Sequence, residues 1–348
     1  MKTISVIGNF RIGQDDVCNG QTIKTRIVYK ALVEKYGEKE TTFFDTHGSK
    51  KKFLALPILL WKQMKSANNV IMITAHGGVK FVSPILTFLN LFYRRKLHYV
   101  VIGGWLPGFL LKHKFLRGII RKFHHIYVET TTMKKALEDQ GFKNVVVMPN
   151  CKFLDILNTD DVDDCFSEPL KLCTFSRVSK GKGIADAVYA VKKANVILGR
   201  TAYALDIYGQ LENDEVEWFN ELSHDFDSCI HYKGMVPFDQ SVNVLKDYFA
   251  LLFPTRFYTE GIPGTIIDAY AAGIPVISSK WESFSDVVED GKTGYGFEFC
   301  NPESLTDILL EVAKSPQMIV VQKVNCLKKA YDYLPANVIN LFEIGEST

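Results

Sequence analysis

The chain lacks an apolar run long enough to cross a membrane. Its longest apolar stretches, one within Lys50 to Lys62 and one from Phe81 to Tyr93, fall short of the roughly 20 residues that a spanning helix needs. The chain opens with Met-Lys-Thr-Ile-Ser-Val-Ile-Gly, which is typical of a first strand. This start lacks the charged region, apolar core and cleavage site of a signal peptide. We therefore expect a cytoplasmic protein.

Cysteines spaced as metal ligands are also missing. The seven cysteines lie far apart, without a two-residue spacing and without a histidine cluster beside them. This distribution is typical of reduced thiols in a cytosolic protein, with neither a zinc site nor a disulfide framework. Zinc-finger spacing, aromatic RNA-binding strands and basic heptads are absent as well. We therefore expect no nucleic-acid partner.

Acidic residues are missing from much of the first half, although the net charge of the whole chain is only +2. Residues 1–150 contain 24 Lys and Arg against 9 Asp and Glu, and the remaining residues contain 17 against 30. From Thr46 to Val128 there are 14 basic residues and no acidic one. Apolar residues recur there at helical spacing with cations between them: Leu111, Phe115, Ile119 and Phe123 with Lys112, Lys114, Arg117, Arg121 and Lys122. Such a face predicts attachment to an anionic membrane leaflet, with solvated cations around an ordinary core as the alternative.

Two carboxylates flank a predicted helix start in the second half. The apolar run from Phe249 to Phe253 predicts a buried strand, Glu260 lies on the loop after it, and Asp268 lies in the following helix. Acids on both sides of an anion site suit a sugar nucleotide. The first helical residues would offer free backbone amides to its phosphates: Gly264, Thr265 and Ile266.

This segment resembles the signature of family 4 retaining glycosyltransferases, in which two acids are separated by seven residues. The matching residues are Glu260-Gly-Ile-Pro263, then Asp268-Ala, then Ala271-Ala-Gly-Ile-Pro-Val276. The resemblance implies that Glu260 contacts the donor sugar and that Asp268 contacts the nucleotide ribose. The chain departs from the family at Asp268, where the family usually has Glu.

A basic turn upstream strengthens the resemblance. The predicted strand from Leu170 to Ser176 is followed by two cations, Arg177 and Lys182, and then by a helical pattern. The resemblance implies that these cations grip the donor diphosphate and stabilise the leaving nucleotide. A solvated basic loop is the alternative.

Two acidic clusters have the form of metal-binding pairs known from other glycosyltransferases. They are Asp160 to Asp164 and Asp225-Phe-Asp227, and neither follows a convincing apolar strand. We interpret both as solvated acids and expect a metal-independent enzyme without a cofactor.

Strands alternate with helices throughout, which predicts an α/β protein with doubly wound parallel sheets. The resemblance implies the GT-B architecture, in which two Rossmann-like domains face each other across a cleft. The expected divisions are an N-terminal acceptor-side domain over 1–155, a linker over 156–169, a donor domain over 170–325, and a segment over 326–348. A helix within Val321 to Phe342 is expected to cross back toward the first domain.

The N-terminal domain supplies further candidates. The loop after the first strand resembles one that places a glycine, here Gly13, beside the donor phosphates. His76, just beyond a predicted strand, is a catalytic candidate near the donor sugar, with a structural role as the alternative. Met235 and Val236 lie where the family presents backbone to the base. The acceptor-side candidates are Asn19, Gly20, Lys24 and Arg26.

The function expected from these observations is transfer of a hexose-type sugar. The donor is a nucleoside diphosphate sugar, with uridine favoured over guanosine. The acceptor is a lipid-linked or growing saccharide in cell-surface polysaccharide synthesis, reached from the inner face of the plasma membrane. A sugar-nucleotide epimerase or hydrolase, and a non-catalytic nucleotide-sugar binding module, are the rival interpretations.

Overall fold

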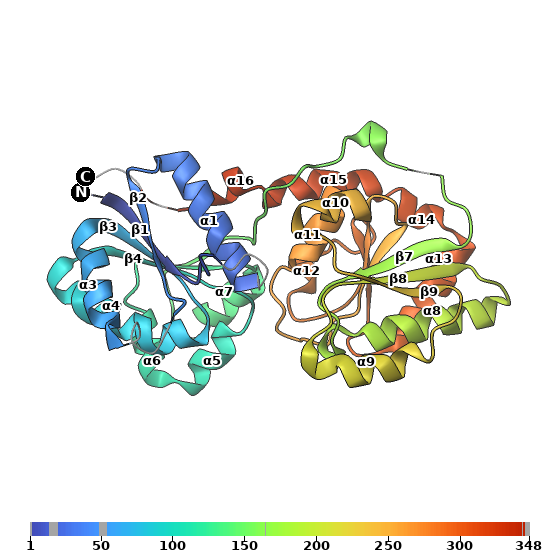
Figure 1. Cartoon of the computed structure of the whole chain (residues 1–348), viewed down its shortest axis with the longest axis horizontal. Coiled ribbons are helices and arrows are strands. Elements are labelled where there is room, and N and C mark those ends of the chain that lie inside the picture. The colour runs from blue at the N-terminus through green and yellow to red at the C-terminus, as the bar shows by residue number, and fades with distance from the viewer. Residues whose placement is uncertain (1, 14–19, 49–53, 164, 343, 345–348) are drawn as a thin grey trace. The chain divides into compact units, whose positions relative to one another are not determined.

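The chain divides into two compact units, each built on its own sheet (Figure 1). The structure, a computed structural model, describes residues 2–13, 20–48, 54–163, 165–342 and 344, with the backbone alone for residues 2 and 3. The first unit comprises Met1–Phe153 and Tyr333–Thr348, and the second comprises Leu154–Asp332. Each unit contains a six-stranded parallel sheet with helices packed on it, as the alternation of strands and helices predicts.

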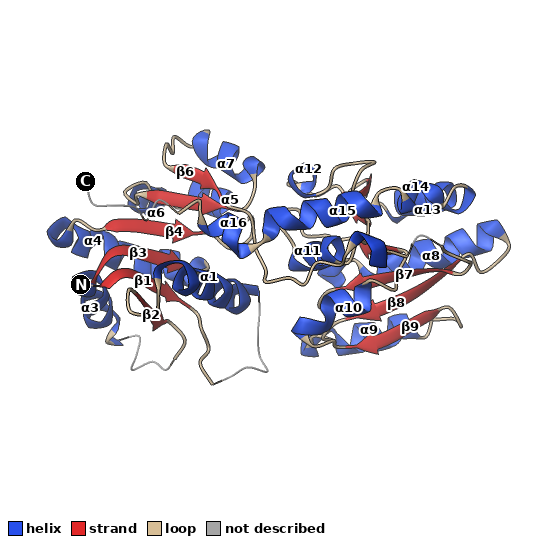
Figure 2. Ribbon diagram, turned by 90° about the horizontal axis from the view of Figure 1, so that it is seen from above, coloured by secondary structure: helices blue, strands red, loops and turns tan. Residues whose placement is uncertain are grey.

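The sheet of the first unit has the strand order β2-β1-β3-β4-β5-β6 (Figure 2). Its strands are β1 (Lys2–Gly8), β2 (Thr41–Asp45), β3 (Ala67–Ile73), β4 (Lys96–Val100), β5 (His125–Val128) and β6 (Val145–Val147). Every pair of neighbours is parallel, and Val6 of β1 lies opposite Phe43 of β2 and Ile71 of β3. The chain therefore reaches each next strand through a helical crossover, which places helices on the faces of the sheet.

The helices of this unit form a layer on each face of the sheet. They are α1 (Gly20–Tyr36), α3 (Leu56–Ser66), a π-helical turn (Gly78–Val82), α4 (Ser83–Tyr93), α5 (Leu106–Lys112), α6 (Lys114–Ile120), α7 (Thr131–Glu138) and α16 (Pro335–Ile339). Ile4 and Val6 pack with α1 and α16, whereas Ile7 packs with the layer formed by α3 to α7. The period-two alternation of β1 thus supplies both cores. Within the described ranges, no helix is long and apolar enough to cross a membrane.

The sheet of the second unit has the order β12-β11-β10-β7-β8-β9, again with parallel neighbours. Its strands are β7 (Leu170–Phe175), β8 (Tyr203–Tyr208), β9 (Ile230–Gly234), β10 (Ala250–Phe253), β11 (Val276–Ser279) and β12 (Gly294–Phe297). Its α-helices are α8 (Ile184–Leu198), α9 (Val216–Ser223), α10 (Ser241–Leu245), α11 (Gly264–Ala271), α12 (Phe284–Val287), α13 (Pro302–Lys314), α14 (Gln317–Val320) and α15 (Lys323–Ala330). The 3-10 turns are Thr159–Asp161, Lys180–Lys182, Asn213–Glu215 and Phe238–Gln240.

The segment expected as a linker, residues 156–169, packs on the second unit instead of spanning between units. The amide of Leu157 donates to the carbonyl of Ala271 (2.9 Å), and Lys323 Nζ donates to the carbonyl of Asp163 (2.9 Å). The boundary between the units therefore lies at Phe153, ahead of the expected linker.

The helix expected within Val321 to Phe342 is divided into three shorter elements. These are α15, a 3-10 turn at Tyr331–Tyr333, and α16, which begins at Pro335. Proline lacks the amide proton that a continuing helix needs, and it disfavours helical backbone in the residue before it. α15 packs on α11 and α16 packs on α1, so the chain returns to the first unit at Tyr333.

A buried ion pair joins α1 to the residue that follows β5. Lys24 is 3% exposed, and its ammonium donates to Glu129 Oε1 (2.5 Å) and to the carbonyl of Val101 (3.0 Å). Glu129 is 4% exposed and also accepts from the amide of Gly103 (3.3 Å). The Lys24 charge is therefore compensated inside the first unit, which corrects the expectation that Lys24 faces an acceptor.

Breaking this pair from either side should destabilise the first unit. Lys24→Met and Glu129→Gln each leave one buried charge without its counter-ion, so each should lower the free energy of unfolding by about 3–5 kcal/mol. The double variant Lys24→Met/Glu129→Leu removes both charges, so its free energy of unfolding should fall less than that of either single variant. Urea unfolding followed by circular dichroism measures the three values. Lys30→Met, at the exposed Lys30–Glu34 pair, is the control. A small effect in both single variants would contradict the role given to the pair.

Candidate functional site

The two central strands of the second sheet lead into the loops that carry the expected site residues. β7 and β10 are neighbours, yet the chain continues from β7 to β8 and from β10 to β11, on opposite sides of the pair. In an open α/β sheet, ligands bind where the strand order reverses in this way, beyond the carboxyl ends of the strands. Arg177 and Lys182 follow β7, and Glu260 follows β10. The topology thus brings together residues that are far apart in the sequence.

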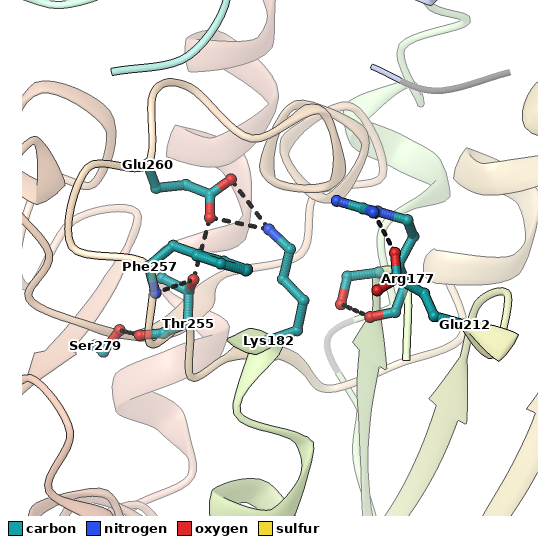
Figure 3. Close-up of polar contacts among 8 residues, drawn as sticks. Arg177, Lys182, Glu212, Thr255, Phe257, Glu260 and Ser279 are labelled. Atoms are coloured by element: carbon teal, nitrogen blue, oxygen red, sulfur yellow. Dashed lines mark hydrogen bonds and ion pairs between the residues drawn. The ribbon is translucent and has the colours of Figure 1, made fainter. Parts of the chain in front are cut away.

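Lys182 and Glu260 form an ion pair at this point (Figure 3). Lys182 Nζ donates to both carboxylate oxygens of Glu260, at 3.0 and 2.9 Å. The Thr255 hydroxyl donates to the same carboxylate (3.1 Å), and the rings of Phe253 and Phe257 lie 5.4 and 5.2 Å from the ammonium. The side chains of Lys182 and Glu260 are 11% and 19% exposed. Both charges are therefore largely shielded from water and fixed in orientation.

Two glycines allow the loops to approach closely enough for this contact. A Cβ atom added to Gly183 would lie 1.8 Å from the carbonyl oxygen of Pro254, and Gly183 has a φ of +69°. A Cβ atom added to Gly181 would lie 2.4 Å from the ring of Phe257. The amide of Arg256 also donates to the Gly181 carbonyl (2.9 Å). The Lys-Gly-Lys-Gly sequence is thus needed for packing as well as for charge.

A second ion pair, which sequence reasoning missed, fastens the same loop to α8. The guanidinium of Arg256 donates to both carboxylate oxygens of Asp186, at 2.8 and 2.6 Å, and the Asp186 side chain is 7% exposed. These hydrogen bonds raise the pKa of Arg256. The only sequence signal for this pair is an acid in the first turn of a helix, which also suits the helix dipole.

Arg177 lies near Lys182 but pairs with a different carboxylate. Figure 3 shows Arg177 beside Glu212, from the loop after β8, on the side of Lys182 away from Glu260. The Arg177 side chain is 61% exposed, so its guanidinium remains open to solvent. Glu215 follows β8 as well, and its Oε2 lies 3.8 Å from Lys180 Nζ. The structure therefore adds two acids to the expected basic turn.

The start of α11 supplies fewer free amides than expected. The amide of Ile266 donates to the carbonyl of Pro263 (3.1 Å), which leaves the amides of Gly264 and Thr265 at the helix start. The Thr265 hydroxyl oxygen is buried, and no hydrogen-bond partner for it lies among the described residues. Asp268 lies in the second turn as expected but is only 4% exposed. Its contact with a ribose stays a prediction.

His76 stacks on an aromatic ring in the first unit. It follows β3, and its imidazole lies 3.7 Å from the ring of Trp105 at an interplanar angle of 24°. Partial burial, and then the positive charge of Lys80, lower the pKa of His76. This lowering of the pKa favours the neutral imidazole. A neutral ring is suited to hydrogen bonding, and its expected contact with a donor sugar stays a prediction.

A pocket of about 300 Å³ opens at the carboxyl ends of β1, β2 and β3. Its wall combines the rings of Phe44 and Phe81 with the side chains of Asn9 and Thr74. Asn9 Oδ1 and Thr74 Oγ1 are buried, and neither has a hydrogen-bond partner within the described residues. Buried polar atoms of this kind normally bind another group. The pocket therefore offers hydrogen bonds and apolar contacts to a small polar ligand.

The remaining expected residues of the first unit lie on its first loop and at the start of α1. Arg26 donates to the carbonyls of Phe10 and Arg11, at 2.8 Å each, so it holds the first loop in place. Gly13 has a φ of +78° with open space at its Cβ position, and Gly20 begins α1. Asn19 lies outside the described residues.

The expected base contacts follow an edge strand of the second sheet. Met235 and Val236 come directly after β9, and Met235 is 66% exposed.

In the described ranges, no three His, Cys, Asp or Glu side chains gather as a metal site requires.

Sequence comparisons match the second unit to known glycosyltransferases. Residues 169–315 match the family model described as glycosyl transferases group 1. The amylovoran biosynthesis glycosyltransferase AmsK of Erwinia amylovora is 24% identical over 161 residues, which are 45% of this chain and 39% of that protein. The putative colanic acid biosynthesis glycosyltransferase WcaL of Salmonella typhimurium is 26% identical over 139 residues, 36% of this chain and 32% of that protein. The chain thus spans well under half the length of these relatives.

Solved structures resemble the chain over nearly its whole length. HepE of Anabaena, in complex with UDP-glucose, aligns with a TM-score of 0.74 at 14% identity and covers 98% of both chains. Sucrose-phosphate synthase of Thermosynechococcus elongatus aligns with a TM-score of 0.75 at 13% identity over 98% of this chain and 97% of that one. The lipopolysaccharide outer core galactosyltransferase WaaB aligns with a TM-score of 0.67 at 16% identity over 97% of each chain. At these identities the likeness shows the fold, which is GT-B.

Replacing Gly183 should disturb the paired loops. Gly183→Ala places a Cβ atom in the space of the Pro254 carbonyl and forces a left-handed backbone on alanine, so it should destabilise the second unit by at least about 1 kcal/mol. Gly199→Ala is the matched control, because Gly199 also has a positive φ (+65°) but has no atom within 4 Å of its Cβ position. Thermal unfolding of both variants gives the comparison. An equal loss in the two would show that backbone strain alone, without the loop contact, determines the effect.

Proposed function

We propose that this chain, whose second unit is a group 1 glycosyl transferase domain, transfers a sugar from a nucleoside diphosphate sugar to a saccharide acceptor. The observation that carries the proposal is the Lys182–Glu260 pair at the point where the strand order reverses. An exposed guanidinium, that of Arg177, and the first amides of α11 come from the same loop edge of the sheet. Cations and helix amides suit a diphosphate, and a fixed carboxylate suits sugar hydroxyls.

In this proposal, the cations Arg177 and Lys182 exchange their carboxylate partners for the donor diphosphate when the donor binds. Arg177 pairs with Glu212 and Lys182 pairs with Glu260 in the free protein. A diphosphate takes over both cations, together with the amides of Gly264 and Thr265. The Glu260 carboxylate is then released from part of its ion pair and accepts hydrogen bonds from the sugar. Asp268 contacts the ribose, and the segment with Met235 and Val236 contacts the base, for which we propose uracil.

The proposed reaction retains the configuration of the sugar and uses no enzyme nucleophile. The bond from the anomeric carbon to the phosphate oxygen breaks as the acceptor oxygen bonds to that carbon from the same face. The acceptor proton passes to the departing phosphate. Arg177 and Lys182 stabilise the negative charge that gathers on the nucleotide, which is the kind of electrostatic effect that usually contributes most to catalysis. We propose that the reaction needs no metal ion.

We propose a lipid-linked or growing saccharide of a cell-surface polysaccharide as the acceptor. The pocket beside Asn9 and Thr74 supports this choice, because it pairs unsatisfied polar atoms with aromatic rings that can stack on a sugar. The names of the amylovoran and colanic acid relatives support it as well. The pocket replaces Lys24 and Arg26 as the acceptor region, since the charges of both bind within the first unit.

We also propose that the protein works at the cytoplasmic side of an anionic membrane and binds no nucleic acid. Support comes from the 14 basic residues between Thr46 and Val128, a stretch without acids. Each Lys or Arg near an anionic leaflet adds about 1 kcal/mol of attraction. This attraction weakens as salt shortens its range from about 10 Å at 0.1 M to about 3 Å at 1 M.

Turnover of Glu260→Gln tests the reaction. A thermal-shift screen of sugar nucleotides first identifies the donor, because a ligand at 100 times its Kd stabilises by about 2.7 kcal/mol. Release of nucleotide that depends on an added saccharide then distinguishes transfer from hydrolysis, epimerisation or simple binding. Glu260→Gln should lower kcat/KM at least about tenfold while the fold is kept. Glu289→Gln, at an exposed ion pair of the same unit, is the control. Full turnover in Glu260→Gln would remove Glu260 from the mechanism.

Nucleotide affinity tests the exchange of ion-pair partners. Arg177→Ala and Lys182→Ala each remove a charge-assisted contact of about 1.5–3 kcal/mol, so each should weaken nucleotide binding by at least about tenfold. Glu212→Gln frees Arg177 from a competing carboxylate and should tighten binding by up to about fivefold, because an exposed pair contributes about 0–1 kcal/mol. Isothermal titration gives the three affinities. If Arg177→Ala and Lys182→Ala bind as the unchanged protein does, the basic turn does not contact the diphosphate.

A further inference from the structure

The outward side of α4 is apolar, where a helix on a water-exposed surface is normally polar. Residues 81–93, which include α4, contain no charged side chain. The inner side of the helix packs Leu86 into the core of the first unit. The outer side exposes Phe88, Leu91 and Phe92, at 61%, 65% and 73%. A helix that is apolar all round belongs in an apolar environment on both sides.

The two helices beside α4 extend this surface. α4 packs against α3 and α6, and all three belong to the layer on the sheet face opposite α1 and α16 (Figure 1). α3 exposes Ile58 and Trp61, at 61% and 40%, and α6 exposes Phe115 at 73%. We call these six side chains the apolar ridge: Ile58, Trp61, Phe88, Leu91, Phe92 and Phe115. Monomeric proteins rarely leave so many large apolar side chains exposed on neighbouring helices without a binding role.

The segments that form the apolar ridge carry cations and no acids. Lys62 and Lys65 are exposed on α3, and Lys65 Nζ lies 5.5 Å from the ring of Trp61. Lys112 and Lys114, next to Phe115, are exposed as well. Apolar and aromatic side chains among flexible lysines suit the boundary between lipid headgroups and acyl chains.

We propose that the apolar ridge inserts into an anionic bilayer, with the outer surface of α3, α4 and α6 facing the lipid. This inference rests on the membrane association proposed above and adds a contact that persists when salt screens the charges. A bilayer satisfies both properties of the surface, because acyl chains accept the ridge and anionic headgroups accept the lysines. A second copy of the chain would satisfy only the apolar part, since two surfaces with the same positive charge repel each other.

Sedimentation with vesicles at low and high salt tests the proposal. The vesicles contain equal parts of phosphatidylcholine and phosphatidylglycerol. The test variant is Phe88→Ser/Leu91→Ser/Phe92→Ser, and its matched control is Val196→Ser/Ile197→Ser on α8, where the exposed fractions are 79% and 55%. At 1 M salt, where electrostatic attraction reaches only about 3 Å, the unchanged protein and the control should still sediment. The triple variant should partition at least about tenfold more weakly.

Tryptophan fluorescence gives a second measurement of insertion. Vesicles should shift the emission of the unchanged protein to shorter wavelength, and brominated phospholipids should quench it. Trp61→Phe should remove most of both effects while binding continues. Nucleotide affinity of the triple variant should equal that of the unchanged protein, which shows that the second unit is folded.

Three results would overturn the insertion. Equal sedimentation of the triple variant and the unchanged protein at 1 M salt would exclude a contribution from the ridge. Complete loss of binding by all proteins at 1 M salt would leave an electrostatic contact alone, and the proposed membrane association would survive. A lipid-free dimer that the triple variant abolishes would assign the ridge to a second copy. Glycosyl transfer to a water-soluble acceptor is measured separately and is unaffected by any of these results.

Discussion

The contact between the Lys182 ammonium and the Glu260 carboxylate determines the arrangement of the second unit's loop edge. The two residues come from loops after adjacent parallel strands, and they meet only because Gly181 and Gly183 let the first loop lie against the second. The Arg256–Asp186 pair joins the second of these loops to the start of α8. Each of these contacts restricts the conformations that the two loops can adopt, and so favours the other contacts. The result is a Glu260 carboxylate whose position is fixed by contacts within the second unit.

The charges next to the loop edge of the second unit affect a nearby ion more than the net charge of residues 151–348 does. Residues 151–348 contain 17 basic and 30 acidic residues, which disfavours anions at long range. Charges beyond about 8 Å are largely screened at physiological salt, so a ligand at the loop edge responds mainly to Arg177, Lys182 and the helix start. Glu212 and Glu260 compensate these cations in the structure, and the proposed function has a diphosphate take over both cations. The net acidity of residues 151–348 is therefore compatible with the proposed binding of a diphosphate at this loop edge.

Buried and exposed cations of the first unit differ in whether they have an acidic partner close in space or in sequence. Lys24, one of its buried cations, is matched by Glu129, whereas the cations of α3 to α6 lie in segments without acids and are not buried. Burial requires a counter-ion because an unpaired charge is costly away from water. At the surface no such requirement exists, and cations can gather around apolar side chains. The first unit thus combines a compensated buried ion pair with a basic and partly apolar outer surface on α3, α4 and α6.

Much of the fold and part of the site could be predicted from the sequence. The alternation of strands and helices predicted parallel sheets, and the strands predicted at Leu170 to Ser176 and Phe249 to Phe253 are β7 and β10 to within one residue. The helix predicted near the end is broken at Pro335, and the linker predicted at 156–169 packs on the second unit, because a local pattern does not show what a segment will contact.

Sequence by itself determined the residue types and the loops on which they lie. The spacing from Glu260 to Asp268 and the Lys-Gly-Lys-Gly turn are local features, so periodicity and turn chemistry reveal them. Pairing is different, because it joins residues far apart in the chain. Only the tertiary structure could assign Glu212 to Arg177 and Glu129 to Lys24, and only it could place Asp268 in a buried position. Strand order decided these outcomes, since it determines which loop ends meet.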